Sequence, residues 1–404
     1  MTPRSSWYRA NININIIIII KINIIIYIKS VQRDIICKLV NLSSLTSLAS
    51  VIPEKDKAID RSLVSVLIPV RNEESRIGIC LESIKNQTYS KLEILVLNDR
   101  SQDGTEKVIQ ASADVDSRVR AITGSTPPED WVGKNWACHQ LFQQSRGEFL
   151  LFIDADTILT EDTITAAVHQ AELLESDLLT VIPQRMTACA AERLLFPLMD
   201  WMLFCWLPIR LAHKKTNRFL SATFGQFMLF RRDAYEAVGG HFEIAGEPLD
   251  DFSLGRRTKS QGLRWVLFQG TGTVAVAASS SNRETIRSVS RSLFPALNYS
   301  LSIFVLLTLV FSAVGFLPLL TLINGALWAN QEYHRLVFSA CSLCLVLTSW
   351  YIVCRKFHHS LLLPLFHPLS TFFMLVVGYH SVISYAFQIT HWKGRSIPHR
   401  RIHW

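Results

Sequence analysis

Residues 148–156 read Glu-Phe-Leu-Leu-Phe-Ile-Asp-Ala-Asp, and they indicate the architecture of the globular region around them. The five consecutive apolar residues 149–153 predict a strand buried on both faces of a parallel sheet. This strand ends in two carboxylates, Asp154 and Asp156, with one small residue between them. Ligands of open α/β sheets collect beyond the carboxyl ends of the strands, so the pair is a candidate site for Mg²⁺ or Mn²⁺. The alternative is that Asp154 caps the next turn and Asp156 is solvated.

The composition points to a globular domain joined to a membrane region. The chain has 404 residues, of which 49% are hydrophobic, and its mean hydropathy of +0.23 is high for a soluble enzyme. Apolar and charged residues are mixed between residues 64 and 270, whereas charges nearly vanish between 301 and 390. The net charge of +8 does not come from basic blocks interleaved with aromatics, which argues against nucleic acid as a partner. Basic residues instead flank the apolar segments, as they do at a membrane surface.

The eight cysteines are scattered, and no pair of them has a spacing that favours metal binding. Cys341 and Cys344 form a C-x-x-C, but both lie inside an apolar run, where packing in a membrane helix explains them. The remaining cysteines indicate only a reducing compartment.

From residue 64 onward, strand and helix patterns alternate at the spacing of right-handed βαβ units. This alternation predicts an α/β fold with a mainly parallel sheet. We expect strands at residues 64–69, 92–97, 118–122, 149–153, 177–182, 264–268 and 273–277.

The regular alternation is interrupted at residues 190–212, which are rich in Leu, Phe, Trp and Met. Pro197, Asp200 and Pro208 argue against a clean membrane-spanning helix. Two interpretations remain open, a helical hairpin in the cytoplasmic interface of a membrane and a buried helix of the globular domain.

The isoleucine-rich residues 11–28 are long enough to cross a bilayer, but they contain a central Lys21 and four asparagines. A charge at the centre of a spanning helix costs about 3 kcal/mol on insertion scales. The segment also has no small-residue cleavage site, so it makes a poor signal peptide. We interpret it either as a marginal membrane anchor or as low-complexity sequence without a fold.

Three apolar spans, about 301–323, 337–354 and 361–388, are near or above the length that crosses a bilayer. Arginines precede the first span, which places the globular domain in the cytoplasm under the positive-inside rule. A third simple crossing would put the basic tail outside. Pro364 and Pro368 indicate instead that the last segment is broken or partly interfacial and returns the tail to the cytoplasm.

Acidic side chains follow several of the predicted strands. The carboxyl ends of parallel strands meet along one edge, so these acids converge on one crevice. A cluster of carboxylates needs a cation to neutralise it, and a metal bound to a diphosphate would supply one. The residues concerned are Asn72 and Glu73 after the first strand, Asp99 and Asp103 after the second, Asp154 and Asp156 after the fourth, and Asp250 and Asp251 on a later element.

Five motifs in this order resemble glycosyltransferase family 2, whose members have the GT-A fold. They lie at residues 64–73, 98–105, 154–156, 225–240 and 250–251. Residues 131–137, Trp-Val-Gly-Lys-Asn-Trp-Ala, and 392–395, Trp-Lys-Gly-Arg, are similar to the membrane-anchored branch associated with hopanoid and carotenoid pathways. The resemblance covers about residues 63–280 and the tail. It implies a GT-A fold with a mainly parallel mixed sheet, followed by C-terminal transmembrane helices.

The resemblance also implies roles for individual residues. The loop after Pro69, with Asn72 and Glu73, and the side chain of Asp99 would hold the base and ribose of a nucleotide sugar. Asp154 would contact ribose or metal, and Asp156 would ligate the Mg²⁺ or Mn²⁺ that bridges the donor diphosphate.

Asp251 matches the general base of the family, which deprotonates the acceptor hydroxyl as that hydroxyl attacks the anomeric carbon. Such an arrangement implies single displacement with inversion. Of its neighbours, Asp250 is expected to be a solvated acid. Lys134 could meet a phosphate near a helix N-terminus or be an ordinary surface lysine.

Other motif residues have structural explanations that we favour. Asp103 is expected to cap a helix. Trp131 and Trp136 could stack on a sugar, but packing is the preferred explanation, and His139 is expected to be structural.

Two departures from the family pattern bear on function. The usual acidic pair after the second strand is Asn98-Asp99 here, which leaves Asp99 to contact the base. The Gln/Arg-x-x-Arg-Trp motif of processive synthases is missing, because Arg287 and Arg291 are wrongly spaced and no Trp follows. Transfer of one sugar to one acceptor is therefore favoured over polymerisation.

The sequence thus predicts a low-complexity segment or possible anchor with a linker at residues 1–60, a catalytic domain at 61–285 with possible interfacial helices at 190–215, and a transmembrane region with a basic tail at 286–404. The predicted function is metal-dependent, inverting transfer of a sugar from a nucleotide-sugar donor to a lipid-like acceptor, at the cytoplasmic face of a cell membrane. The alternatives are a polysaccharide synthase or polyprenyl-phosphate glycosyltransferase, and a non-catalytic nucleotide-binding membrane protein. A nicotinamide-binding protein is disfavoured, because no Gly-x-Gly-x-x-Gly follows the first strand.

Overall fold

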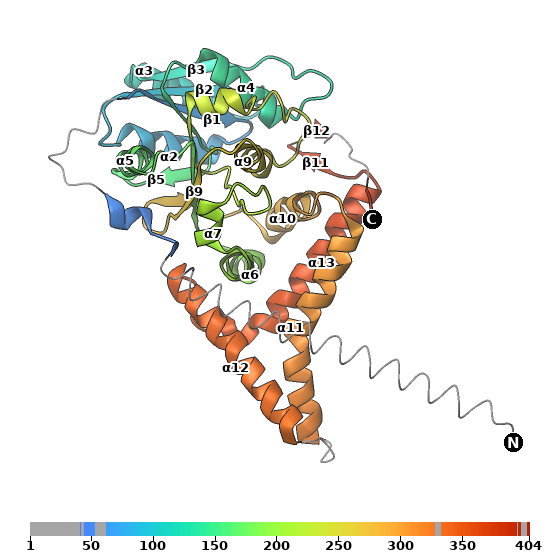
Figure 1. Ribbon diagram of the computed structural model, residues 1–404. Coiled ribbons are helices and arrows are strands. Elements are labelled where there is room, and N and C mark those ends of the chain that lie inside the picture. The colour runs from blue at the N-terminus through green and yellow to red at the C-terminus, as the bar shows by residue number, and fades with distance from the viewer. Residues whose placement is uncertain (1–40, 42–43, 53–61, 328–332, 394, 397–401) are drawn as a thin grey trace, which may run out of the picture.

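A computed structural model describes residues 41, 44–52, 62–327, 333–393, 395–396 and 402–404 (Figure 1). The isoleucine-rich segment 11–28, interpreted above as a marginal anchor or low-complexity sequence, lies outside the described residues.

The core of the catalytic region is a seven-stranded sheet with the order β3-β2-β1-β4-β8-β6-β9. β8 is antiparallel to both of its neighbours, and the other neighbouring pairs are parallel. The predicted mainly parallel mixed sheet is therefore confirmed. Its strands are β1 (Val64–Val70), β2 (Leu92–Asn98), β3 (Val119–Thr123), β4 (Phe149–Phe152), β6 (Leu178–Ile182), β8 (Met228–Arg231) and β9 (Trp265–Gln269).

β4 lies in the middle of this sheet, between β1 and β8. All four of its residues are buried, as expected for an apolar run that is covered on both faces. Because β4 runs parallel to β1, its carboxyl end and the carboxyl ends of β1 and β2 open on the same edge. Asp154 and Asp156 follow β4 at that edge.

Helices cover both faces of the sheet (Figure 1). In α2 (Glu74–Lys85) the buried residues recur at helical spacing, so one stripe of the helix packs on the sheet and the opposite face meets water. These residues are Ile77, Cys80, Leu81 and Ile84. The other covering helices are α3 (Thr105–Val115), α4 (Gly133–Gln144), α5 (Thr163–Leu173), α8 (Arg232–Ala237) and α9 (Asp250–Ser260). A small second sheet joins β5 (Thr157–Leu159), β10 (Val274–Val276) and β7 (Gln184–Arg185).

The segment with two open interpretations folds into α6 (Ala190–Trp206) and α7 (Ile209–Lys214). α6 lies between the sheet and the apolar helices of the C-terminal region, and it contacts the second and third of those helices (Figure 1). Leu195, Leu198 and Trp201 on α6 are at most 2% exposed, because they pack into the same hydrophobic core as residues of the sheet and of the apolar helices. This packing matches the interpretation of α6 as a buried helix.

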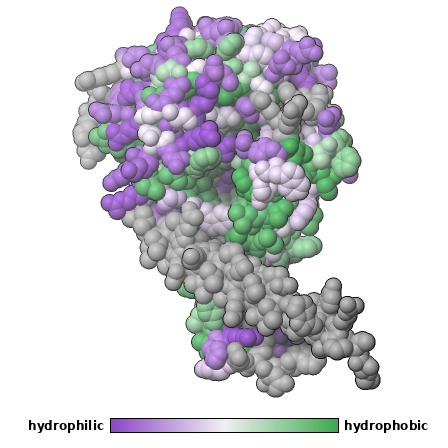
Figure 2. All heavy atoms as spheres, turned by 45° about the vertical axis from the view of Figure 1, so that its right-hand side comes forward, coloured by the Kyte–Doolittle hydropathy of each residue, from purple (hydrophilic) through white to green (hydrophobic). Residues whose placement is uncertain are grey.

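After α10 (Asn282–Ala296) come three helices that are long and apolar enough to cross a membrane, α11 (Leu301–Leu327), α12 (Tyr333–Lys356) and the continuous η2 (Leu363–Phe366) and α13 (His367–Ala386). Much of their apolar surface is exposed, for example Leu309 at 59% and Phe372 at 58%. Figure 2 shows mostly hydrophilic side chains over the upper part of this face and a hydrophobic area on its right-hand side, above the grey residues.

The polypeptide after α13 returns to the catalytic region. Its strands β11 (His391–Trp392) and β12 (Arg395–Ser396) pair with each other. Lys393 contacts the loop after β1 and Arg395 contacts the loop after β2. Farther along, His403 pairs with Ser300 at the start of α11. The described tail therefore lies on the same side of the apolar helices as the catalytic region.

Candidate active site

The edge at the carboxyl ends of β1, β2 and β4 carries the predicted acids. Asp156 belongs to the turn between β4 and β5, in which the Thr157 amide donates to the carbonyl of Asp154 at 3.1 Å. Burial, reinforced by the charges of Asp154 and Glu73, raises the pKa of Asp156 to about 7. Its Oδ1 atom is buried and has no hydrogen-bond partner among the described residues. A buried carboxylate of this kind fits a hard divalent cation, because the cation would give the unpaired oxygen a positively charged partner.

Lys134, the second residue of α4, joins two acids of the site. Its Nζ lies 2.9 Å from Oδ1 of Asp154 and 3.1 Å from Oδ2 of Asp250. Burial opposes the charge of Lys134, but the two carboxylates outweigh it and raise the pKa of the ammonium well above its ordinary value. Lys134 is therefore not an ordinary surface lysine, whereas its contact with a phosphate stays a prediction.

Asp251 is the second residue of α9 and faces the loop before β8. Its Oδ2 accepts a hydrogen bond from the amide of Gly225 at 3.0 Å. Burial and the adjacent charge of Asp250 raise the pKa of Asp251 to about 7. A Cβ at Gly225 would stand 3.2 Å from Nζ of Lys134, which is a tight contact, and 3.5 Å from Oδ2 of Asp251, which is an ordinary one.

Asp250 is not the solvated acid that the sequence predicted. It is 5% exposed, and it lies between Lys134 and the fully buried His241, whose Nε2 is 3.6 Å from its Oδ2. Burial would raise the pKa of Asp250, but Lys134 and His241 outweigh that effect and hold the pKa well below its usual range. The expectation failed because Lys134 is 116 residues away in the chain, and local sequence does not reveal such a partner.

The loops expected to hold the nucleotide base are covered by residues from the tail. Asp99 accepts two hydrogen bonds from Arg395, and its side chain is only 4% exposed. Burial raises the pKa of Asp99 against the opposing effect of Arg395. Glu73 forms an ion pair with Lys393, which also donates to the carbonyl of Arg71. The two acids thus lie at the predicted edge, but in this state both are bound to the protein itself.

The other predicted nucleotide contacts shape these loops. Pro69 is half-buried in β1, where it pairs with Leu97. Asn72 has a positive φ of 49°, and its Oδ1 accepts a hydrogen bond from the amide of Gln102, which ties the loop after β1 to the loop after β2. Asp103 accepts from the amide of Thr105 in the first turn of α3, in agreement with its predicted structural role.

The aromatic residues of the 131–137 motif pack on one another. The ring centroids of Trp131 and Trp136 are 5.0 Å apart, and both rings contact His139. Phe242 completes the cluster beside Trp131. These contacts match the preferred packing explanation and the structural role expected of His139.

Four site residues were missed by sequence reasoning. Lys393 and Arg395 lie in the Trp-Lys-Gly-Arg motif, which carried the resemblance but received no role. His241 follows Gly239-Gly240 in another quoted motif, and only its burial distinguishes it. Arg291 on α10 is close enough to Asp154 to interact electrostatically, and burial lowers its pKa. The sequence pattern assigned Arg291 no role, because its spacing does not match the synthase motif.

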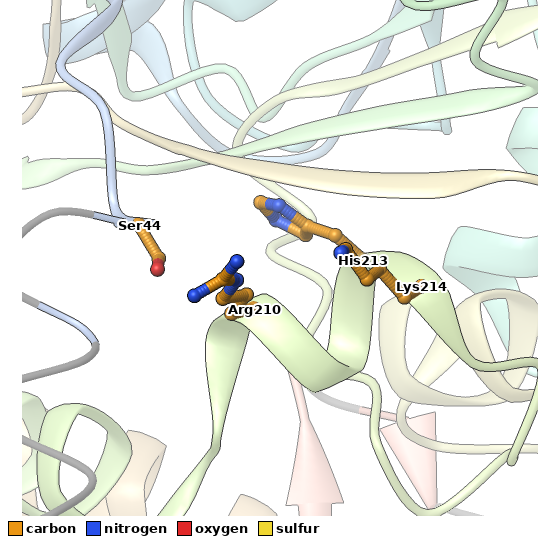
Figure 3. Close-up of a pocket in the computed structure, with 4 residues that line it drawn as sticks. All are labelled: Ser44, Arg210, His213 and Lys214. Atoms are coloured by element: carbon orange, nitrogen blue, oxygen red, sulfur yellow. The ribbon is translucent and has the colours of Figure 1, made fainter.

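A separate cavity of about 320 Å³ is lined by none of the predicted site residues (Figure 3). Its lining is Ser44, Arg210, His213 and Lys214. His213 accepts a hydrogen bond from the amide of Leu267, and burial with the charge of Lys259 lowers its pKa to about 4. This histidine is therefore neutral at physiological pH.

Comparison with known proteins identifies the catalytic region. Residues 65–239 match the model of glycosyl transferase family 2, the family whose motifs this region resembles. The 4,4'-diaponeurosporenoate glycosyltransferase of Staphylococcus aureus strain USA300 is 31% identical over 216 residues, which are 52% of this chain and 55% of that protein. The corresponding protein of the bovine strain RF122/ET3-1 is 32% identical over 217 residues. The chain therefore aligns with about half the length of these curated relatives.

Among solved structures, the fold is similar to that of the mannosyltransferase PcManGT from Pyrobaculum calidifontis, determined in complex with GDP-Man and Mn²⁺. The match has a TM-score of 0.50 and 16% identity, and it covers 87% of this chain and 98% of that protein. The predicted GT-A fold is confirmed by this likeness together with the sheet topology.

Proposed function

We propose that the protein is an inverting glycosyltransferase that moves one sugar from a nucleotide-sugar donor to a lipid-like acceptor, such as a carotenoid or hopanoid, at the cytoplasmic face of a membrane. The observation that carries the proposal is the presence of two unlike acids in one site, where Lys134 bridges their neighbours Asp154 and Asp250. Asp156 has a buried oxygen without a hydrogen-bond partner in the described part of the chain, and Asp251 has a pKa of about 7 on the neighbouring helix α9.

Asp251 is suited to act as the general base, because a pKa near the working pH combines ionisation with the ability to accept a proton. The acceptor hydroxyl gives its proton to Asp251 while its oxygen forms a bond to the anomeric carbon. The bond from that carbon to the donor diphosphate breaks, and the nucleoside diphosphate leaves with the electron pair. One displacement of this kind inverts the configuration of the sugar.

Asp156, together with Asp154, would hold Mg²⁺ or Mn²⁺, and a cation there stabilises the negative charge of the leaving diphosphate. Lys134 lies against Asp154 and adds a second positive charge on this side of the site. Asp99 and Glu73 remain the proposed contacts of the base and ribose, which requires Arg395 and Lys393 to release them.

The acceptor class rests on the membrane-type region and on the relatives. The relatives are named for transfer to diaponeurosporenoate, and three helices of this chain are apolar enough to cross a bilayer. We propose that α11 and α12 cross the membrane as a hairpin. The tail would then stay with the catalytic region in the cytoplasm.

The alternatives predict different products. A polysaccharide synthase would give labelled polymer, and a polyprenyl-phosphate glycosyltransferase would give a lipid that is labile to mild acid. A non-catalytic nucleotide-binding protein would bind nucleotide without transfer. The buried acids Asp250 and Asp251 argue against that last possibility, because keeping two adjacent carboxylates buried is costly without a function.

The test is a transfer assay with the full chain in membranes. Membranes are incubated with labelled UDP- and GDP-sugars, and lipids are then extracted. We expect label in a neutral lipid fraction, lost on adding EDTA and in Asp156→Ala and Asp251→Asn. The control Asp114→Ala, at an exposed position on α3, should transfer normally. Undiminished transfer by Asp251→Asn would rule out the proposed base.

A further inference from the structure

A buried polar cluster lies behind the proposed base. His241 is 0% exposed and Tyr235 is 1% exposed. Ligand-type atoms of His241, Asp250 and Cys138 all lie within 4.8 Å of one another. Nε2 of His241 and Oδ2 of Asp250 face each other at 3.6 Å, and Nε2 has no other hydrogen-bond partner among the described residues, whereas Oδ2 also lies 3.1 Å from Nζ of Lys134. Two facing polar atoms in this condition need either a shared proton or a shared cation.

The hydrogen bonds of Tyr235 decide which ring nitrogen of His241 carries the proton. The hydroxyl oxygen of Tyr235 accepts from the backbone amide of His241 at 3.0 Å. The same hydroxyl lies 2.7 Å from Nδ1 of His241. The phenol keeps its proton because burial raises the pKa of Tyr235, and it donates a hydrogen bond to Nδ1, the acceptor that lies 2.7 Å from its oxygen. Nδ1 is then an acceptor, and the single proton of the neutral ring must be on Nε2.

A metal ion shared by the cluster fits these groups poorly. A metal would need the lone pair of Nε2, which the tautomer fills with a proton. It would also need Cys138 as a thiolate, whereas burial raises the pKa of that thiol well above its ordinary value. Finally, Nζ of Lys134 already lies 3.1 Å from Oδ2 of Asp250. The geometry therefore favours a proton between His241 and Asp250.

We propose that His241 is a positioning residue of the active site, which donates from Nε2 to Asp250 and fixes the orientation of that carboxylate. The proposal rests on the proposed roles of Asp251 and Lys134. It defines a buried chain that runs from Tyr235 through His241 and Asp250 to Lys134 and ends on Asp154. His241 touches no substrate in this scheme, because it acts through Asp250.

The orientation of Asp250 affects the site on two sides. Lys134 reaches Asp154 at 2.9 Å while it is held by Asp250, so the position of one carboxylate sets the position of the ammonium at the other. Asp251 is the next residue in the first turn of α9, and its own bond to Gly225 requires that turn to be held in place. Without a donor at His241, the Asp250 carboxylate would turn toward Lys134. The ammonium of Lys134 and the carboxylate of Asp251 would then both shift from their positions in the site.

The test compares two replacements of similar size at one position. His241→Gln keeps an N–H donor near the place of Nε2, and His241→Leu removes it. With the labelled nucleotide sugar that the wild type transfers, we expect kcat to fall about tenfold or more in the Leu variant, since a hydrogen bond to a charged group is lost, and to recover largely in the Gln variant. Equal kcat in the two variants would overturn the proposal.

Tyr235→Phe supplies a second kinetic arm, because it removes the group that selects the tautomer. We expect a smaller loss of kcat in Tyr235→Phe than in His241→Leu. In the double variant we expect kcat to be no lower than in His241→Leu alone, because two members of one hydrogen-bonded chain do not act additively. Additive losses would show that the two residues stabilise the fold independently, against the proposal.

An arm that does not depend on activity separates this proposal from the proposed function. The full chain is purified with ¹⁵N-labelled histidine rings, and the His241 signals are identified by their loss in His241→Gln. The proposal requires a protonated Nε2 and an unprotonated Nδ1 in the wild type. A proton on Nδ1, or a metal bound in stoichiometric amount and lost in His241→Gln, would overturn the positioning role even if sugar transfer is observed. If no donor supports transfer, this spectrum still decides the role of His241.

Discussion

Arg395 donates two hydrogen bonds to Asp99, at 2.7 and 3.1 Å, across 296 residues of sequence. The pair fixes the tail on the loop after β2, where the base of the donor is proposed to bind. Lys393 makes the equivalent contact with Glu73 on the loop after β1. The state described is therefore one in which the tail occupies both acids of the proposed nucleotide site.

Removing Arg395 should strengthen nucleotide binding. A base can reach the 4%-exposed side chain of Asp99 only after Arg395 withdraws, so the wild type loses this charged pair when it binds. We expect Arg395→Ala to lower the Kd of UDP or GDP by up to about tenfold, the scale of one charge-assisted hydrogen bond. Calorimetry on the detergent-solubilised full chain measures this, with the exposed Arg120→Ala as the control. Weaker binding by Arg395→Ala would mean that this arginine contacts the donor directly.

Transfer should depend on pH through Asp251. With a pKa of about 7, this base is protonated and inactive at low pH, and it ionises as the pH rises through 7. At saturating Mn²⁺ we expect kcat to rise about tenfold per pH unit below 7 and to level above it. Asp250→Asn removes the charge that raises this pKa, so any residual activity should show the rise at lower pH. A profile that is flat between pH 5 and 8 would contradict Asp251 as the base.

Divalent metal should couple to nucleotide binding through Asp156. If Asp156 ligates the metal, Mn²⁺ will tighten the binding of UDP or GDP in the wild type, and EDTA will reverse the effect. Asp156→Asn should lose this coupling and most of the transfer activity, whereas the exposed control Asp114→Asn should keep both. Unchanged coupling in Asp156→Asn would place the metal elsewhere.

The buried ion pair between Asp200 and Arg185 should be sensitive to the loss of one partner. Asp200, on α6, also accepts from His359 at 2.8 Å, and so it joins β7, α6 and the turn after α12. Asp200→Ala leaves Arg185 buried without its carboxylate, and we expect a loss of about 3–5 kcal/mol in unfolding free energy.

The matched control is the double variant Asp200→Leu with Arg185→Met, which replaces both charges by apolar groups. It should recover much of the stability, because no unpaired charge remains. Thermal unfolding of the full chain in nanodiscs measures both variants. A double variant as unstable as Asp200→Ala would show that packing, and not the unpaired charge, causes the loss.

The sequence patterns predicted those features that depend on neighbours along the chain. The apolar run before Asp154 and the alternation of strands and helices were sufficient to predict a mainly parallel sheet, because the burial of a strand depends on the apolar character of its own residues. The solvated state expected for Asp250 was wrong, since its burial depends on Lys134 and His241, which reach it only through the fold. The interaction of Arg395 with Asp99 was missed for the same reason, as no local pattern pairs residues so far apart.

The tail also has a consequence for how the protein is made. Asp99 leaves the ribosome 296 residues before Arg395, and the three apolar helices are synthesised in between. The acidic loops therefore remain without these partners until α11, α12 and α13 have been synthesised. Synthesis in this order means that the contacts of Arg395 with Asp99 and of Lys393 with Glu73 form only after the apolar helices have been made, so a chain that stops before the tail would lack both contacts.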